Sequence, residues 1–369
     1  MKVLYFTRTQ SPHDLRFTQA LALTEHQVFV LCLEPVADRQ WPGNIVEIEW
    51  HGITPNEVGQ SLNDQLSGLK DVFESIKPDL VHAGPIQTAA YYTAKVGFHP
   101  LVTMSWGSDL MLEADENPFS QFVTRFTLEH TDILVGDCAC VGDKAELFGF
   151  SNQDYIQFPW GVDLHHFSPS GSASLREKLR WQDNIVLLSN RTFAPLYGVD
   201  TLLSAFASAS FENPNLRLLL FGKGPQESQF RQFVNDHDLA DKVYFGGQAS
   251  LDELPDVYHS SDFYLSASHS DGSSVSLMEA LACGLPAVVS DIPGNIEWIE
   301  ENRQGWLFKD GEPHDFSQKI LLAASLIGKI DNMKSGNRFL AEQRADWNKN
   351  FPVLLEAYKS ALAKQVKND

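Results

Sequence analysis

The sequence has few positively charged residues: 28 Lys and Arg stand against 48 Asp and Glu, which gives a formal net charge of -20 at pH 7. Nonspecific binding to nucleic acid depends on Lys and Arg that contact phosphates, so the composition argues against a nucleic-acid partner. A broad basic face for anionic lipid is disfavoured for the same reason, although the composition permits weak peripheral contact with a membrane. A small phosphorylated ligand is compatible with this charge, because a helix N-terminus and one or two local cations can hold it.

Cysteines and long apolar runs are also scarce. Four cysteines in 369 residues do not make a disulfide framework, and the C-x-C of Cys138 and Cys140 has no second pair at the spacing of a zinc site. No stretch approaches the roughly 20 unbroken apolar residues of a membrane-spanning helix, and the opening MKVLYF is typical of a strand rather than a secretory leader. We therefore expect a cytoplasmic protein with no transmembrane segment, no essential metal and no resident cofactor.

What the sequence does contain is a regular alternation of short apolar segments with helix-like segments. Such alternation predicts βαβ units and parallel sheets, and short continuous apolar strands suit sheets that are covered on both faces. The apolar segments lie at residues 3–6, 26–33, 79–84, 100–106, 131–137, 184–190, 216–222, 242–247, 262–268 and 285–291.

The length of 369 residues and a break around residues 163–182 predict two domains of similar size. The break is rich in Ser, Gly and Pro, which is typical of a linker. We expect an α/β fold of two Rossmann-like, doubly wound parallel-sheet domains that face a central cleft. The expected boundaries are 1–163, 164–345 and a closing helix at 346–369. Ligands of such sheets bind outside the carboxyl ends of the strands, so the cleft is the expected site.

One segment, residues 263–297, carries the features of a ligand site. Its apolar strand ends in the polar loop HSDGSS, and a helix is expected from about Ser274 until Gly284 ends it. Gly272 allows close approach of the backbone to a ligand, while Ser273 and Ser274 offer hydroxyls and amides at a helix N-terminus. This arrangement is typical of a diphosphate cradle. The alternative is that Ser273 or Ser274 only caps the helix.

Two carboxylates, Asp271 in the loop and Glu279 eight positions further on, add to this interpretation. A carboxylate accepts paired hydrogen bonds from vicinal hydroxyls, which is how ribose and hexose are commonly held. A solvated helix face is the alternative for Glu279. Its neighbours Leu277, Met278 and Ala280 are apolar, which makes a solvated face the weaker interpretation.

The same segment resembles the signature of the retaining glycosyltransferases of family four, the group 1 glycosyl transferases, which have the GT-B architecture. That signature is a Glu, seven residues and a second Glu, followed by A-x-A-C-G-x-P. Here Asp271 stands at the first position, Glu279 at the second, and ALACGLP follows. The resemblance implies that Asp271 faces the donor sugar and that Glu279 holds the ribose hydroxyls. It also implies that amides from Gly272 to Val275 meet the phosphates and the sugar.

The resemblance covers essentially the full length of the chain. FPWGVDLHHFSP resembles the hinge between the two domains of the family, and FGKGPQ resembles a strand-to-helix loop of its second domain. VYFGG resembles the strand that ends beside the nucleobase. The terminal DWNKNFPVLLEAY resembles the helix that crosses back to the first domain.

One departure from the family pattern concerns the diphosphate. LSNRTFAPLYG resembles the segment in which an Arg and a Lys clamp the donor diphosphate; Arg191 is in place, but Tyr197 stands where Lys normally precedes the glycine. A phenol offers one hydrogen bond and no cation. Lys223 in FGKGP is the candidate that offsets this loss, and a surface salt bridge is the alternative interpretation of Arg191.

A second departure lies in the first domain, where VTMSWGSDL carries Trp106 at a position at which many family members have His. Trp can stack on a sugar face but cannot move protons at neutral pH. Asp109 is therefore the predicted polar or proton-accepting group, with a helix N-cap as the alternative. His13, Arg16, His82 and Trp106 are the candidate residues on the acceptor side.

These features predict a retaining glycosyltransferase that moves a hexosyl unit from a nucleoside diphosphate sugar, with a UDP-sugar favoured, to a saccharide or other hydroxyl acceptor. Synthesis of surface polysaccharide or glycoconjugate is the expected context. The alternatives are a nucleotide-sugar epimerase of similar fold and a catalytically silent relative that binds nucleotide-sugar.

Overall fold

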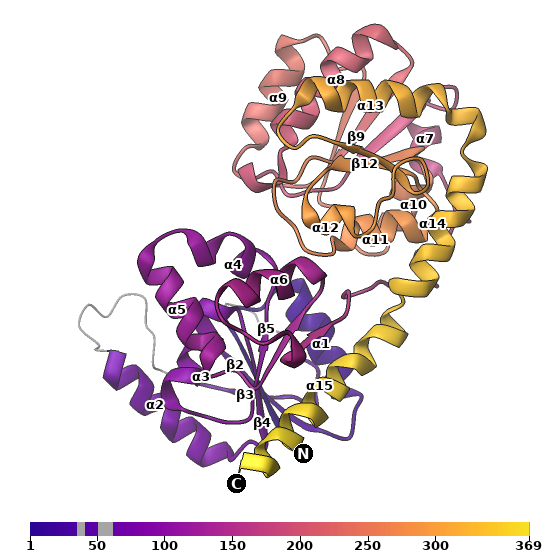
Figure 1. The fold of residues 1–369 in the computed structure, drawn as a ribbon. Helices are drawn as coiled ribbons and strands as arrows, with labels where there is room; N and C mark the ends of the chain where they lie inside the picture. Colours follow the sequence, from indigo (N-terminus) through magenta and orange to yellow (C-terminus); the bar gives the residue numbers. More distant parts are fainter. Residues whose placement is uncertain (35–40, 51–61, 369) are drawn as a thin grey trace. The chain divides into compact units, whose positions relative to one another are not determined.

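The computed structural model describes residues 1–34, 41–50 and 62–368, and it consists of two compact units. Unit 1 comprises Met1–Phe158 together with Phe351–Asp369, and unit 2 comprises Pro159–Asn350 (Figure 1). The chain passes from one unit to the other after Phe158 and after Asn350, while the domain boundaries expected from the sequence follow residues 163 and 345. In the described residues, no helix combines the length and the apolar character that a membrane crossing requires.

Unit 1 is built on a seven-stranded sheet in which all neighbouring strands are parallel. The order β3-β2-β1-β4-β5-β6-β7 is that of a doubly wound sheet. The five apolar segments predicted in this half of the sequence form β1, β2, β4, β5 and β6, and β3 and β7 are additional strands of three residues. The bounds are β1 (Lys2–Thr7), β2 (Gln27–Cys32), β3 (Val46–Ile48), β4 (Leu80–Gly84), β5 (Leu101–Met104), β6 (Ile133–Gly136) and β7 (Tyr155–Gln157).

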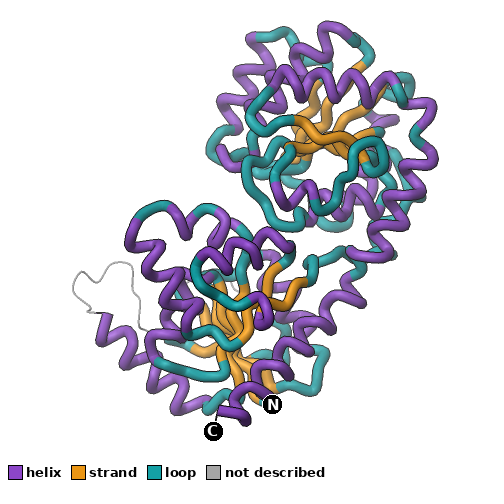
Figure 2. Tube along the Cα trace, in the orientation of Figure 1, coloured by secondary structure: helices purple, strands orange, loops and turns teal. Residues whose placement is uncertain are grey.

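Helices cover both faces of the sheet in unit 1 (Figure 2). On one face, Leu4, Phe6 and Val81 pack against α2 (Leu62–Ile76) and α3 (Tyr91–Val96). On the other face, Tyr5 and His82 lie near α15 (Trp347–Asn368). The other helical segments are α1 (Pro12–Ala22), η1 (Ile86–Ala90), α4 (Ser108–Met111), η2 (Glu113–Asp115), α5 (Pro118–Glu129), α6 (Ala139–Leu147) and η3 (Asn152–Asp154).

Unit 2 repeats this plan with six parallel strands in the order β10-β9-β8-β11-β12-β13. The five predicted segments form β8 to β12, and β13 is additional. The bounds are β8 (Ile185–Ser189), β9 (Leu216–Phe221), β10 (Val243–Gly247), β11 (Phe263–Ser266), β12 (Ala287–Ser290) and β13 (Gly305–Phe308). The two all-parallel sheets confirm the predicted α/β fold class.

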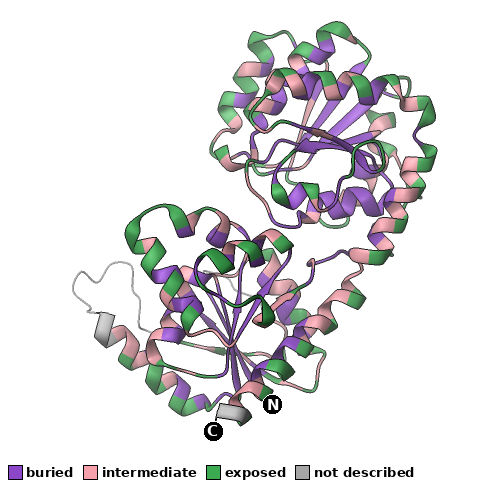
Figure 3. Ribbon diagram, viewed as in Figure 1, coloured by how far each residue is buried: buried purple, intermediate pink, exposed green. Residues whose placement is uncertain are grey.

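The strands of unit 2 are buried on both faces because successive side chains point to opposite sides (Figure 3). Leu187 and Phe263 pack with residues of α8 (Val199–Glu212), α9 (Glu227–Asp236) and α13 (Pro313–Ser325). Leu188 and Tyr264 pack with residues of α10 (Leu254–His259), α11 (Val275–Ala282) and α14 (Asp331–Arg344). The short segments are α7 (Ser174–Lys178), η4 (Pro195–Tyr197), α12 (Pro293–Ile296) and η5 (Ile327–Lys329).

His82 joins the sheet of unit 1 to α15. Its Nδ1 lies 2.6 Å from the hydroxyl of Tyr358, and its ring meets that of Tyr5 edge-on. The side chain is buried, and burial lowers the pKa of His82 to about 3. His82 is therefore neutral at pH 7 and contributes to the core beneath α15.

The buried His82 predicts a loss of stability in acid. The unfolded chain binds a proton at His82 below about pH 6.5, whereas the folded chain does so only near pH 3. This group should therefore lower the free energy of unfolding by about 1.4 kcal/mol per pH unit once the pH drops below the pKa of His82 in the unfolded chain. Urea denaturation of wild type and His82→Phe between pH 7 and about pH 4 should show a shallower decline in the variant. Parallel declines in the two proteins would contradict the assignment.

Candidate functional site

Unit 2 has its topological switch point between β8 and β11, since β9 and β10 lie on one side of this pair and β12 and β13 on the other. In doubly wound sheets, ligands bind in the crevice outside the carboxyl ends of the strands at such a point. The loop after β8 carries Asn190 and Arg191, and the loop after β11 carries Asp271 to Ser274. The predicted donor residues therefore leave two adjacent parallel strands at the same edge.

Arg191 connects these two loops. Its Nη1 donates to Ser274 Oγ at 2.7 Å and to Ser276 Oγ at 2.9 Å, and its Nη2 donates to Asp271 Oδ2 at 2.5 Å. The arginine side chain is 9% exposed, which rules out the alternative of a surface salt bridge. Burial alone would lower the pKa of Arg191, but the Asp271 carboxylate, together with Tyr264 and Tyr197, outweighs that effect and raises it.

Tyr197, which stands where the family pattern has Lys, lies over the guanidinium of Arg191. The Cζ atom of Arg191 is 4.5 Å from the centre of the Tyr197 ring. The negative face of an aromatic ring attracts such a cation. Tyr197 ends η4, and Gly198 follows with φ of 56°, where an added Cβ would lie 2.1 Å from the carbonyl oxygen of Ala267. The tight turn therefore fixes the ring against Arg191.

The N-terminus of α11 is formed by the predicted cradle residues. Ser274 is the N-cap residue, but its hydroxyl makes no capping hydrogen bond and instead accepts from Arg191. Ser273 Oγ accepts from Trp298 Nε1 at 3.0 Å. The interpretation that these serines only cap the helix is therefore wrong. The N-terminal end of a helix carries partial positive charge, and here it follows directly on Gly272 and Asp271.

Glu279 lies on the buried side of α11. Its side chain belongs to the interior, with the residue 8% exposed, so the alternative of a solvated helix face is wrong. Glu279 Oε2 accepts a hydrogen bond from the hydroxyl of Tyr258 at 2.6 Å. Tyr258 in turn accepts from Asn190 Nδ2 at 2.8 Å. This carboxylate is thus tied to the same loop that carries Arg191.

A cavity of about 360 Å³ opens beside these residues and is lined by Asn190, Arg191 and Lys223, among others. This volume is within the usual range for a small-molecule site. The sequence alone could not place Lys223 relative to Arg191, whereas the structure puts both on one cavity wall. Two buried polar atoms on this wall, Arg191 Nε and Asn190 Oδ1, have no hydrogen-bond partner in the described structure.

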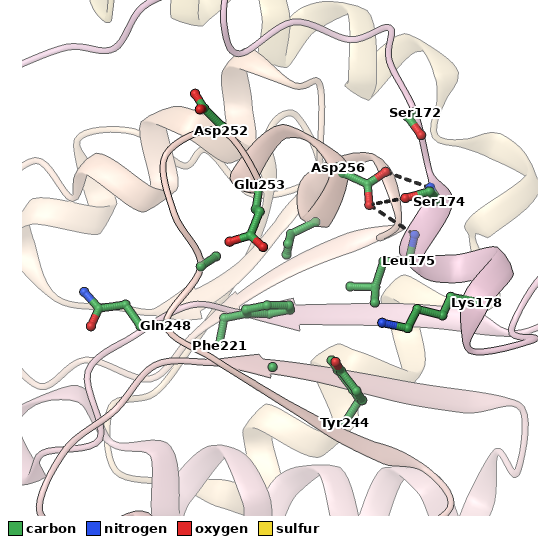
Figure 4. A pocket seen from close by; sticks show the side chains of 13 residues that line it. Ser172, Ser174, Leu175, Lys178, Phe221, Tyr244, Gln248, Asp252, Glu253 and Asp256 are labelled. Carbon is green, nitrogen blue, oxygen red and sulfur yellow. Dashed lines mark hydrogen bonds between the residues drawn. The ribbon is translucent and has the colours of Figure 1, made fainter.

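A second cavity, of about 510 Å³, adjoins the first and shares Phe221, Gln248 and Ala249 with it. Figure 4 shows Lys178 and Tyr244 lining it together with Phe221. On its far side Asp256 accepts hydrogen bonds from Ser174 and Leu175, which fastens α7 to α10. Phe221, at the end of β9, and Gln248, which follows β10, line both cavities. The resemblance had placed the nucleobase near the end of β10.

Asp109, the predicted polar group of unit 1, is enclosed by hydrogen-bond donors. Its Oδ1 accepts from Ser105 Oγ at 2.7 Å and from the Leu110 amide at 2.9 Å, and its Oδ2 accepts from the Ile86 amide at 3.1 Å. Burial raises the pKa of Asp109, and these hydrogen bonds offset part of the rise. The N-cap of α4 is Gly107, so the alternative N-cap role of Asp109 is wrong. A proton-accepting role for Asp109 stays a prediction.

The other candidates of unit 1 fall into two places. His13, at the start of α1, stacks on Trp106 with ring centres 5.7 Å apart, so the start of α1 and the loop after β5 meet at these residues. Arg16 lies one turn further along α1 and is half-buried. His82 does not join them, because it lies within β4 beneath α15.

Two parts of the chain match models of known protein families. Residues 172–338 match the model of glycosyl transferases group 1, and residues 2–137 match that of the glycosyl transferase 4-like family. Both matches are to glycosyltransferase families, and together they take in most of the chain.

Curated relatives share part of their length with this chain. It is 32% identical over 175 residues to the GtfA subunit of a UDP-N-acetylglucosamine–peptide N-acetylglucosaminyltransferase from Streptococcus pneumoniae. This match covers 47% of this chain and 34% of that protein. The chain is 28% identical over 213 residues to a D-inositol 3-phosphate glycosyltransferase from Saccharomonospora viridis, which covers 55% of this chain and 49% of that protein. The chain thus spans about a third to a half of the length of these relatives.

Solved structures match nearly the whole chain. Sucrose-phosphate synthase from Thermosynechococcus elongatus has a TM-score of 0.81 at 17% identity, covering 98% of this chain and 99% of that one. The Anabaena protein Alr3699/HepE, in complex with UDP and glucose, has a TM-score of 0.80 at 17% identity, covering 98% and 100%. With the two parallel sheets, these likenesses confirm the predicted two-domain GT-B fold.

Sequence reasoning missed three residues of this site. These residues are Asn190, Tyr258 and Ser276. Each one forms a hydrogen bond with Arg191, with Glu279 or with another of the three, and the bonded residues are 18 to 85 positions apart in the sequence. Tyr258 occupies an apolar position of a short helix, which is typical of a core residue. The one available signal was Asn190 itself, a polar residue directly after a buried strand and beside the predicted Arg191.

The loop of Asp271 and Gly272 is held against α12 at Gly294, which gives a direct test. A Cβ at Gly294 would lie 2.3 Å from the carbonyl oxygen of Gly272 and 2.5 Å from that of Asp271. Gly294→Ala should therefore displace this loop and lower the free energy of unfolding by about 1–3 kcal/mol, the usual cost of overpacking. Thermal unfolding measures the change, with Gly328→Ala as the control, because its added Cβ meets nothing within 4 Å. Equal stability of the two variants would show that the loop does not depend on this contact.

Proposed function

We propose that this protein transfers a hexosyl unit from a UDP-sugar to a hydroxyl group of a saccharide or similar acceptor, with retention of the anomeric configuration. The observation that carries the proposal is the convergence of the buried Arg191 guanidinium, the N-terminus of α11 and the buried Glu279 carboxylate at one switch point. The solved Anabaena relative binds UDP and glucose, which supports UDP as the nucleotide. Surface polysaccharide or glycoconjugate synthesis in the cytoplasm is the proposed context.

In this proposal each group at the switch point holds one part of the donor. Glu279 accepts hydrogen bonds from the ribose hydroxyls, which a carboxylate can bind in pairs. Arg191, Lys223 and the amides from Gly272 to Val275 bind the diphosphate. Asp271, which already accepts from Arg191, faces the donor sugar.

The chemical step breaks the bond between the anomeric carbon and the phosphate oxygen, and UDP leaves with the electron pair. Positive charge develops on the sugar ring and negative charge on the leaving phosphate. Fixed donors such as Arg191 and the helix N-terminus stabilise that phosphate without rearranging at the moment of reaction. The acceptor oxygen then bonds to the anomeric carbon, and its proton passes to the leaving phosphate. On the acceptor side we propose Trp106 and His13, stacked on each other, with Arg16 and Asp109.

Replacement of Glu279 tests the donor assignment. Glu279→Ala should weaken UDP binding by about 10- to 100-fold, since a hydrogen bond to a charged group contributes roughly 1.5–3 kcal/mol. Titration calorimetry measures the affinity, and sugar transfer should fall in parallel. Glu300→Ala is the control, because that side chain is 64% exposed and pairs with Arg303. Unchanged binding and transfer in Glu279→Ala would refute the proposed site.

The same assay separates the alternative activities. Conversion of the donor to another sugar nucleotide without acceptor would indicate an epimerase. Binding of UDP-sugar without transfer to a broad acceptor panel would indicate a silent relative, an alternative that the aromatic Tyr197 in place of Lys favours. A thermal-shift screen of UDP- and GDP-sugars selects the donor, since a ligand at a hundred times its Kd adds about 2.7 kcal/mol of stability.

Two substitutions at Tyr197 test whether its ring or its hydroxyl matters. The ring lies over Arg191, and such a contact contributes roughly 0.5–2 kcal/mol. Tyr197→Ala should therefore weaken UDP binding by about two- to thirtyfold, because the guanidinium loses the surface that fixes its plane. Tyr197→Phe retains the ring and should bind UDP as the wild type does. A loss of the same size in both variants would instead assign the effect to the hydroxyl.

A further inference from the structure

We propose that Tyr258 and Asn190 are positioning residues that orient the Glu279 carboxylate toward the ribose of the donor nucleotide. The inference rests on the proposed function, because it takes Glu279 to be the group that binds the ribose. It adds two residues from separate elements, the loop after β8 and helix α10, to the glutamate on α11.

The direction of the hydrogen bonds is fixed by chemistry. An ionised carboxylate only accepts hydrogen bonds, so the Tyr258 hydroxyl must donate its single proton to Glu279 Oε2, 2.6 Å away. The carbonyl oxygen of Ser276 also lies within reach at 3.1 Å, but the shorter, charge-assisted bond is the stronger one. Burial and the nearby Glu279 charge both raise the pKa of Tyr258, so this proton is retained.

The orientation of Asn190 follows from that of Tyr258. Because the phenol proton points at Glu279, the phenol oxygen must accept from the side-chain nitrogen of Asn190, 2.8 Å away. The order is therefore Asn190 to Tyr258 to Glu279, with each group donating to the next. The amide oxygen of Asn190 is left facing away from Tyr258, and it has no hydrogen-bond partner within the described residues.

The Tyr258 hydroxyl is held in place by packing. Its side chain is fully buried, and its ring meets Phe167 edge-on with centres 5.8 Å apart. A glutamate side chain has three rotatable bonds and loses entropy when it is fixed. A hydrogen bond from a rigid partner restricts those bonds before the nucleotide arrives, and such preorganisation increases affinity.

The same residues link the ribose side of the site to the phosphate side. Asn190 directly precedes Arg191, and both line the 360 Å³ cavity with Lys223. Ser276, whose carbonyl oxygen lies near Tyr258, accepts a hydrogen bond from Arg191 at its hydroxyl. The same hydroxyl shares a hydrogen bond with that of Tyr264. The Glu279 carboxylate and the Arg191 guanidinium are thus fixed relative to one another through the short segment of Asn190 and Arg191.

The test compares UDP with 2′-deoxy-UDP and 3′-deoxy-UDP by titration calorimetry on the full chain. In the wild type, removal of the hydroxyl that Glu279 binds should weaken affinity by about 10- to 100-fold, as expected for a charged hydrogen bond. In Tyr258→Phe, UDP itself should bind more weakly, and the further loss on removing that hydroxyl should shrink to within about threefold. Asn190→Asp keeps the shape of the side chain but removes the donor to Tyr258. It should also lower the ratio of the Kd for the deoxy nucleotide to the Kd for UDP.

Tyr264→Phe is the matched control. Tyr264 is also fully buried, and its hydroxyl bonds Ser276 on α11 at 2.7 Å, whereas that of Tyr258 bonds Glu279 itself. This variant should therefore retain the wild-type ratio between UDP and its deoxy counterparts, even where its melting temperature is lower. Melting temperatures of all variants show that each is folded at the temperature of titration.

The outcomes separate this inference from the function on which it rests. If the wild type binds UDP with a strong dependence on a ribose hydroxyl and Tyr258→Phe keeps that dependence in full, Tyr258 is merely structural and the inference is overturned. If the wild type shows no such dependence, or Glu279→Ala retains it, the proposed role of Glu279 fails and the inference fails with it. A reduced dependence in Tyr258→Phe, with the wild-type ratio in Tyr264→Phe, supports both.

Discussion

The buried guanidinium of Arg191 is the interaction on which the candidate site depends. Transfer of a charge into the interior is costly unless it is paired and hydrogen-bonded. Here one carboxylate, two hydroxyls and one aromatic ring surround the cation. The loops after β8 and β11 must therefore keep their positions, because loss of either one would leave a buried charge without its partners. The ligand crevice is thus shaped by the protein before any nucleotide enters it.

The parallel sheet determines which residues can meet Arg191. The strand order places β8 beside β11, although some 80 residues separate Arg191 from Asp271. Strands of a parallel sheet end at the same edge, so the loops that follow adjacent strands are neighbours. Helix α11 starts directly after the second loop, which brings its N-terminus and, further along, Glu279 to the same edge. The architecture thereby converts distant sequence positions into one site.

The sequence was sufficient for most of the strands and for the residues with local patterns, but not for β3, β7 and β13. Continuous apolar runs predicted β1 and β8 because buried parallel strands need such runs, whereas the three-residue β3 and β7 contain too few apolar positions to stand out. Arg191 and Glu279 were predicted by resemblance to a family, but their partners Ser276 and Tyr258 were not. Hydrogen bonds between distant elements depend on packing, and no local period of the sequence records them.

The stacked Tyr197 changes the electrostatic balance of the site. Arg191 is already paired with Asp271, so this pair contributes little net charge, and Tyr197 adds none. Beside the donors of Arg191, a diphosphate at this crevice would therefore meet Lys223 and the backbone amides at the start of α11 as its other positive groups. Amide dipoles are fixed by the fold, whereas a lysine side chain has four flexible bonds that must be ordered. The site accordingly relies more on preorganised dipoles than on mobile cations, and preorganised dipoles stabilise a developing charge without reorganisation.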